Sequence, residues 1–328
     1  MFRYEMMASQ TKFGVLLPHF SKHCSRERII DTAKKADELG LDSAWVRDHV
    51  FIPPEQRDHG GIKEDLFTEP LLTLSSIGTV TNDLTLGTAI LWPCRHPIKL
   101  AQNVGTLSYM TDSDIVLGIG IGRFPQEFEA LDLPFDRRPE LITENYEILN
   151  RLFNETDVDF EGELYEFEDV TIHPRPDSEV PLWYGGFSKI AIRRAIDIAD
   201  GILPGRCTFT EFEAKMEFLS ELEEEHGREL SVGMVPVVSV AETTEEAEAK
   251  LNIPKLVEEA SKYGDFEYET KEDIEGYYIA GTPDETAAQI QRFVDMGLEH
   301  VVLDMRHAFD EVEEMMTLIA DEVIPQVD

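Results

Sequence analysis

Cysteine is scarce in this sequence, and long apolar runs are missing. Cys24, Cys94 and Cys207 are far apart and odd in number, so their spacing forms neither a metal-binding pattern nor a disulfide framework. No apolar run approaches the roughly 18 residues that a membrane-spanning helix needs. Residues 1–10 lack the apolar centre of a secretory signal. We therefore expect a cytoplasmic protein with reduced thiols.

Positive charge is also in short supply. The 29 Lys and Arg residues face 66 Asp and Glu residues, which gives a net charge of −37. Such a field repels nucleic acids and anionic membrane surfaces, so we expect neither as a partner. The acidic residues are spread along expected helices, as at 221–225, 245–248 and 311–314. This composition is typical of salt-accumulating halophiles and suggests an archaeal cell, where molar salt screens the self-repulsion.

Short apolar runs alternate with segments of helical periodicity along the chain. The eight expected strands are 13–17, 43–46, 84–90, 115–120, 181–184, 201–204, 232–240 and 300–304, and a helix is expected after each. This order indicates a parallel sheet, and eight strand–helix pairs favour a closed (β/α)8 TIM barrel over a doubly wound open sheet. We expect one domain over residues 1–328, with insertions near 155–180, including a hairpin at 160–165, and near 243–278.

A glycine-rich segment, Ile115–Arg123, stands in the middle of the chain. Its apolar first half reads as a buried strand, and Gly118, Gly120 and Gly122 remove side chains where that strand ends. Bare backbone of this kind lets a flat ring or a phosphate approach the main-chain N–H groups. The alternative is a tight turn that binds nothing. In a barrel, any catalytic residues would lie at these carboxyl ends of the strands.

Motifs spread over nearly the whole chain resemble the bacterial luciferase-like flavin and deazaflavin oxidoreductases. They are Phe13-Gly14-Val15, Leu41–Val46 with Asp48-His49, Glu69-Pro70-Leu71, Leu86–Ala89, Arg95-His96-Pro97, Leu117–Gly122, Glu127–Leu131, Tyr184-Gly185-Gly186, Ala199-Asp200-Gly201 and Gly281–Glu285. The resemblance implies a TIM barrel with insertions and a flavin or deazaflavin ring in its mouth. It also implies a homodimer that pairs through helices beside the barrel.

The same resemblance implies roles for individual residues. His49, with Asp48 beside it, matches the residue at the reactive edge of the ring, where histidine can give or take a proton near neutral pH. Without the resemblance to this family, we would interpret Asp48-His49 as a loop cap. The Ala89–Ile90 bond matches a non-prolyl cis peptide that bulges against the ring.

Three further segments match regions that approach the cofactor. Gly120, Gly122 and Arg123 match the loop after the fourth strand. Gly185, Gly186, Phe187 and Ser188 open a helix whose N–H groups suit a phosphate. Gly205 and Arg206 add a cation there, unless Arg206 is a surface residue. Arg123 departs from the aromatic or acidic residues often found at its position, which counts against a sugar-phosphate dehydrogenase.

The family binds either FMN or the deazaflavin coenzyme F420, and no motif decides between them. The halophile-like composition favours coenzyme F420, and hence an oxidoreductase that transfers a hydride to or from a small organic substrate. The alternatives are a monooxygenase that uses reduced FMN and a flavin-binding protein without catalysis. A nicotinamide enzyme fits less well, because the glycine motif lacks its βαβ context. A metal hydrolase would have to use His19, Asp48, His49 and Asp304.

Overall fold

Eight parallel strands close into a barrel in the computed structural model, which describes residues 11–59, 62–63, 66–264 and 266–328. The strands are β1 (Lys12–Leu16), β2 (Ser43–Val46), β5 (Thr85–Leu91), β6 (Ile115–Gly120), β9 (Leu182–Gly185), β10 (Gly201–Ile202), β11 (Ser231–Met234) and β14 (His300–Leu303). The barrel closes because β1 pairs with both β2 and β14. The predicted (β/α)8 barrel is confirmed, and the open sheet is wrong.

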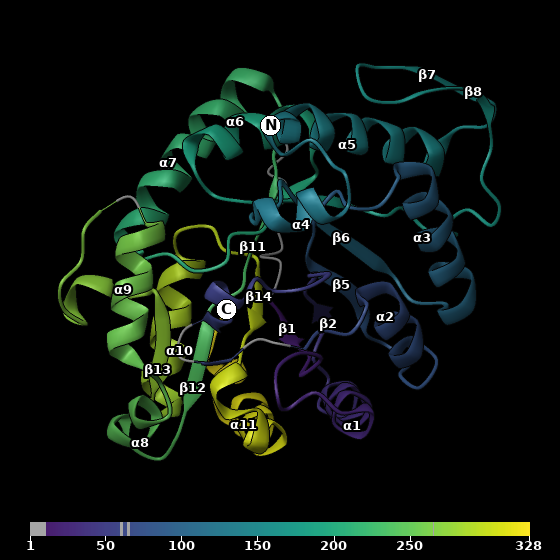
Figure 1. Ribbon diagram of the computed structural model, residues 1–328. Coiled ribbons are helices and arrows are strands. Elements are labelled where there is room, and N and C mark those ends of the chain that lie inside the picture. Colours follow the sequence, from purple (N-terminus) through teal and green to yellow (C-terminus); the bar gives the residue numbers. More distant parts are fainter. Residues whose placement is uncertain (1–10, 60–61, 64–65, 265) are drawn as a thin grey trace, which may run out of the picture.

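Helices surround the strands on the outside of the barrel (Figure 1). They are α1 (Arg26–Glu38), α2 (Pro70–Gly78), α3 (Pro97–Thr111), α4 (Pro125–Ala130), α5 (Arg138–Asn154), α6 (Lys189–Ile198), α7 (Phe209–His226), α8 (Thr244–Ala249), α9 (Ile253–Tyr263), α10 (Pro283–Val294) and α11 (Val312–Leu318). Shorter helical turns span Pro54–Gln56, Phe135–Arg137, Glu272–Ile274, Arg306–Glu311, Ile319–Val323 and Ile324–Gln326. After β14 the sequence predicts one helix, but the chain forms a 3-10 turn, the short helix α11, a π-helical turn and a second 3-10 turn.

Capping residues fix where several helices begin. Ser25 accepts a hydrogen bond from the Arg28 N–H at the start of α1. Thr282 and Glu285 form a reciprocal capping box at the start of α10, where Pro283 occupies the first turn. These ends follow directly from the local sequence.

The expected seventh strand, 232–240, is wrong as a single strand. The chain forms β11 in the barrel and then β12 (Val237–Val240), which pairs with β13 (Tyr278–Gly281) in a separate parallel sheet. Pro236 lies between the two strands and has no N–H to continue a ladder. With α8 and α9, these strands enclose a second hydrophobic cluster that includes Leu256, Ile274 and Tyr277.

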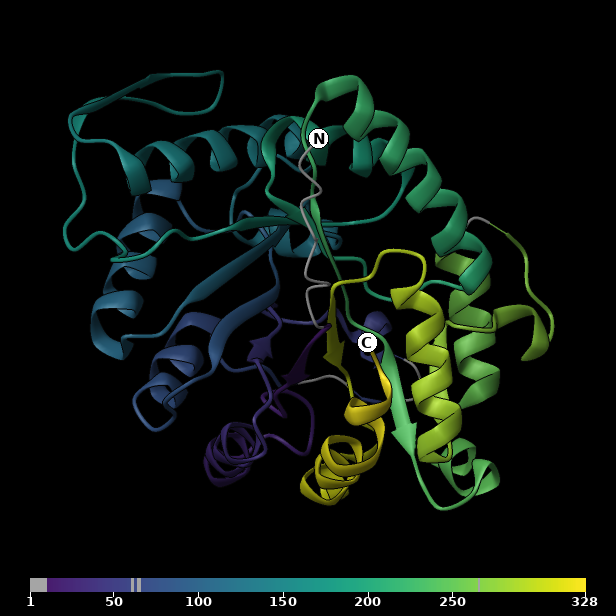
Figure 2. The same cartoon turned by 180° about the vertical axis from the view of Figure 1, so that it is seen from behind.

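Other segments outside the barrel are antiparallel pairs. The expected hairpin forms from β7 (Val158–Glu161) and β8 (Glu166–Val170), and it projects beyond α5 in both views (Figures 1 and 2). The sequence did not predict the pair β3 (Asp58–His59) and β4 (Ile62–Lys63), nor α4 and β13. The description as one domain with two insertions stays a prediction.

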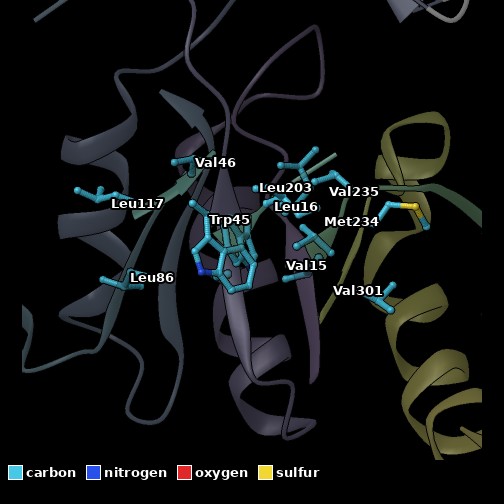
Figure 3. Packing of buried hydrophobic residues seen from close by; sticks show 14 of the residues in the cluster. Val15, Leu16, Trp45, Val46, Leu86, Leu117, Leu203, Met234, Val235 and Val301 are labelled. Carbon is cyan, nitrogen blue, oxygen red and sulfur yellow. The ribbon is translucent and has the colours of Figure 1, made fainter. Parts of the chain in front are cut away.

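The barrel interior is filled by large side chains (Figure 3). Trp45 is fully buried, and a Cβ added at Gly87 would overlap its indole ring. Trp45 Nε1 donates to Ser43 Oγ, which in turn lies 2.8 Å from His300 Nε2. Glycine in β5 is therefore explained here by a tryptophan, and not by a ligand.

No helix in the described part of the chain is long and apolar enough to cross a membrane.

Candidate active site

A two-lobed cavity lies at the carboxyl ends of the barrel strands. The histidine lobe, about 250 Å³, is lined by Arg47, Asp48, His49, Ala89, Ile90, Trp92, Ile121, Gly122, Arg123, Glu127 and Gly185. The arginine lobe, about 330 Å³, is lined by Arg47, Ala89, Ile90, Arg123, Gly185, Gly186, Leu203, Gly205, Arg206, Val235, Tyr263, Tyr277, Asp304 and Arg306. The lobes share five lining residues, Arg47, Ala89, Ile90, Arg123 and Gly185. A separate cavity of about 420 Å³ is lined by residues of α7, α10, β13 and 271–276.

His49 lies on the wall of the histidine lobe, in the loop after β2. Its Nδ1 is 3.1 Å from Glu127 Oε2, and Phe124 and Phe67 pack against the ring with centroids 5.2 and 5.1 Å away. Its side chain remains 16% exposed. The imidazole is thus held by Glu127, Phe124 and Phe67 while it lines the cavity. A catalytic role for His49 stays a prediction.

Asp48 is bound tightly beside His49. Its two oxygens lie 2.6 and 3.2 Å from the Arg95 guanidinium, which also contacts Glu69 at the start of α2. Burial raises the pKa of Asp48, and the charge of Arg95 opposes that rise. The ion network ties together the loops after β2 and β5, so it holds the backbone that carries His49. A catalytic role for Asp48 stays a prediction.

Ile90 forms a ridge between the lobes. The Ala89–Ile90 peptide is cis, as the family resemblance implied. A Cβ added at Gly120 would overlap Ile90 Cδ1, and one at Gly185 would lie 2.6 Å from Ile90 Cγ2. These two glycines therefore make room for the Ile90 side chain. Gly185 also lines both lobes, and the cofactor-binding roles of Gly120 and Gly185 stay predictions.

The arginine lobe concentrates positive charge in an otherwise acidic protein. Arg47, Arg123, Arg206 and Arg306 line it, against a net charge of −37 for the whole chain. Asp304, from the end of β14, pairs with Arg306 at 2.5 Å. Burial alone would raise the pKa of the Asp304 carboxyl, but Arg306, Arg47 and Arg206 together hold it below its usual range.

The insertion after β12 supplies one wall of this lobe. Arg206 Nη1 lies 3.2 Å from Glu259 Oε2 of α9, and the Arg206 side chain is only 10% exposed. Arg123 stacks on Tyr263 at the end of the same helix, with its guanidinium carbon 3.8 Å from the ring centroid. The reading of Arg206 as a surface residue is therefore wrong, since it faces the cavity from beneath α9.

Phe187 and Ser188 lie outside the set of residues that line the two lobes. Phe187 is buried against Phe212, with ring centroids 5.5 Å apart. Ser188 is exposed and caps α6, where its Oγ accepts a hydrogen bond from Ala191 N–H. Gly186 and Gly205 do line the arginine lobe. The cofactor-binding roles of Phe187 and Ser188 stay predictions.

The contacts of several cavity residues carry no local signal in the sequence. Glu127 belongs to a family motif but stands 78 positions after His49, and Tyr263 and Tyr277 belong to the insertion near 243–278. Arg306 follows β14 by three positions and belongs to none of the family motifs. Across the described residues, no group of three or more His, Cys, Asp or Glu side chains could hold a metal ion.

A closed parallel barrel with a cavity at its carboxyl edge defines a (β/α)8 protein whose site is built from the strand-end loops. Within that class, the model of the luciferase-like monooxygenase family matches residues 11–300. The chain belongs to this family.

Curated and solved relatives extend over almost the whole chain. An F420-dependent glucose-6-phosphate dehydrogenase of Microbacterium testaceum is 27% identical and covers 99% of this chain and 97% of its own. An F420-dependent secondary alcohol dehydrogenase, solved with an F420–acetone adduct, has a TM-score of 0.79 at 20% identity and covers 97% of this chain and 99% of its own. A Pseudomonas putida type II Baeyer–Villiger monooxygenase with FMN has a TM-score of 0.76 at 18% identity, with the same coverage. At identities this low, the likeness to the two solved structures shows a shared fold.

Proposed function

We propose that this protein is an oxidoreductase that transfers a hydride between coenzyme F420 and a small organic substrate. The observation that carries the proposal is the two-lobed cavity: a fixed histidine lines one lobe and four arginines line the other, two of which, Arg47 and Arg123, also face the histidine lobe. The names of curated relatives, several of them F420-dependent dehydrogenases, support the same choice of coenzyme.

The residues of the cavity fit this coenzyme. Ala89, Ile90, Leu203 and Val235 offer apolar surface to a flat ring. The arginines suit a phosphate or carboxylate tail, which Arg binds well because its fork of donors matches planar oxyanions. When bound, the deazaflavin supplies two-electron hydride chemistry with little reactivity toward oxygen. The chain itself would orient the ring through Ile90 and exchange the substrate proton through His49.

An anaerobic titration in molar KCl with coenzyme F420, and separately with FMN, tests the choice of coenzyme. We expect tight binding of coenzyme F420 and weak binding of FMN, read from absorbance and fluorescence. Binding of FMN alone would contradict the proposal and favour the monooxygenase. Glucose 6-phosphate and secondary alcohols, the substrates suggested by the relatives' names, are the first to screen for bleaching of the deazaflavin.

The His49→Asn variant tests the catalytic residue. We expect kcat to fall by about 100-fold or more, because general acid–base catalysis contributes about that much. Coenzyme binding should remain within a few-fold of wild type. The His23→Asn variant is the control, since His23 pairs with exposed Asp310 outside the lining of the cavity. Binding without turnover in the wild type would indicate the non-catalytic alternative.

We also propose a homodimer that buries the outer face of α2 and α3. This face exposes Leu72, Tyr109 and Met110 by 70, 71 and 56%. Residues 70–111 contain a single acidic residue, Asp83, although 66 of the 328 residues in the chain are acidic. Two copies of so acidic a protein repel each other least where carboxylates are few.

Light scattering in molar KCl tests this interface. The wild type should be a dimer, and Leu72→Glu combined with Tyr109→Glu should be a monomer. Ile190→Glu is the matched control, because Ile190 is 69% exposed on α6. A dimer that survives the double change would contradict the proposed face.

We further propose that the protein works in the cytoplasm of a cell that accumulates salt.

A further inference from the structure

Glu127 makes a contact with His49 that neither the family motifs nor the proposed function uses. Its side chain is only 2% exposed, and both carboxylate oxygens are occupied. Oε2 lies 3.1 Å from His49 Nδ1, and Oε1 accepts a 2.9 Å hydrogen bond from Val50 N–H. A buried carboxylate is stable only when it is paired or hydrogen-bonded in this way.

The position of Glu127 is fixed by its neighbour in α4. Phe128 is fully buried and packs against Trp92, with ring centroids 4.7 Å apart. Phe124, directly before α4, packs on the imidazole of His49 itself. The helix therefore cannot turn Glu127 away from His49 without also moving Phe124 and Phe128 off His49 and Trp92.

We propose that Glu127 is the positioning residue that sets the tautomer of His49. The carboxylate of Glu127 can only accept a hydrogen bond, so Nδ1 of His49 must carry the proton that it donates. The lone pair of the neutral ring then lies on Nε2. No hydrogen bond to Nε2 is found among the residues that the structure describes, and His49 lines the cavity. Nε2 is therefore the nitrogen presented to a bound substrate.

The consequence for catalysis rests on the proposed function. In the oxidation of an alcohol, the carbon loses a hydride to the coenzyme and the hydroxyl O–H bond breaks as its proton moves to Nε2. The product is a carbonyl compound and an imidazolium. The negative charge of Glu127 at 3.1 Å stabilises that imidazolium, and the reverse reaction returns the same proton to the alkoxide oxygen.

The tautomer can be measured without coenzyme or turnover. Long-range ¹⁵N–¹H spectra of protein labelled at histidine, with His49→Asn to assign the signals, should show protonated Nδ1 and unprotonated Nε2 for wild-type His49. The Glu127→Gln side chain has a single acceptor oxygen, whereas His49 Nδ1–H and Val50 N–H each need an acceptor. The variant should therefore invert or mix the tautomers of His49. A wild-type ring protonated on Nε2, or an unchanged spectrum in Glu127→Gln, would overturn the inference.

Kinetics separate positioning from a purely structural role. Glu127→Gln should lower kcat by about tenfold to 100-fold with little change in KM. Glu127→Asp keeps the charge and should recover part of that loss. Glu129→Gln, which changes an exposed carboxylate on the same helix, is the control and should match wild type. An unchanged kcat in Glu127→Gln would overturn the proposal, whereas the absence of F420-dependent activity in the wild type would count only against the proposed function.

Discussion

His300 is a neutral histidine in the barrel interior, beneath the cavity residues. Ser43 Oγ accepts a hydrogen bond from Trp45 Nε1, so its own hydroxyl proton is available to His300 Nε2 at 2.8 Å. Burial, with a smaller effect from Lys12, lowers the pKa of His300 to about 3. The histidine is therefore an acceptor in a buried network, and protonating it would break that network.

Because of this histidine, the free energy of unfolding should decrease as the pH is lowered. In the unfolded chain His300 takes up a proton near pH 6.5, whereas in the folded protein it does so near pH 3. The unfolded state binds more protons in this window, so the free energy of unfolding decreases as pH falls, by about 1.4 kcal/mol per pH unit for this residue. Denaturant unfolding at several pH values in molar KCl measures the slope.

The His300→Gln variant isolates the effect. Gln retains an acceptor for Ser43 and does not titrate. Between pH 6 and pH 4, the free energy of unfolding of the variant should therefore change with pH less steeply than that of wild type, by about 1.4 kcal/mol per pH unit. His226→Gln, a partly exposed histidine that bonds Leu222 O, is the matched control. Equal slopes for wild type and His300→Gln would contradict the prediction.

At the scale of elements, β6 and β9 contact β5 through the Ile90 side chain. A methyl group at Gly120 would meet Ile90 Cδ1 and the Gly185 carbonyl oxygen. Because Ile90 is the ridge between the two lobes, any displacement of its side chain changes the cavity. The glycines of the strand ends are thus part of the packing that shapes the site.

Gly120→Ala should therefore lower both stability and coenzyme affinity. Overpacking of this kind costs about 1–3 kcal/mol of unfolding free energy. Adding Ile90→Val, which removes Cδ1, should recover part of that loss in a double-mutant cycle. Gly205→Ala is the control for stability, since nothing lies within 4 Å of its Cβ position. Additive effects of Gly120→Ala and Ile90→Val would show that the two residues do not compete for space.

At the scale of the whole molecule, the net charge of −37 opposes folding through self-repulsion. The thermal midpoint should therefore rise as KCl increases from roughly 0.2 M to roughly 2 M, because salt shortens the range of the repulsion. Replacing Glu221, Glu224 and Glu225 of α7 by Gln should reduce this dependence. A midpoint that responds equally to KCl and to an uncharged osmolyte would contradict screening as the cause.

The sequence by itself determined the barrel and its order. Alternating apolar runs and capped helices depend on local chemistry, as at Ser25 and Thr282, and the motifs near His49 and Gly120 located the cavity. The sequence could not show that 232–240 belongs to two sheets, because the choice between a barrel partner and β13 depends on a strand 41 positions away.

Only the tertiary structure decided how the cavity residues are paired. Glu127 reaches His49 across 78 positions, and Glu259 reaches Arg206 across an insertion. Such contacts depend on side-chain packing between elements, which leaves no periodicity in the sequence. Gly120 and Gly185 illustrate the limit: their pattern indicated a close approach, but only the packing showed that Ile90 is what approaches.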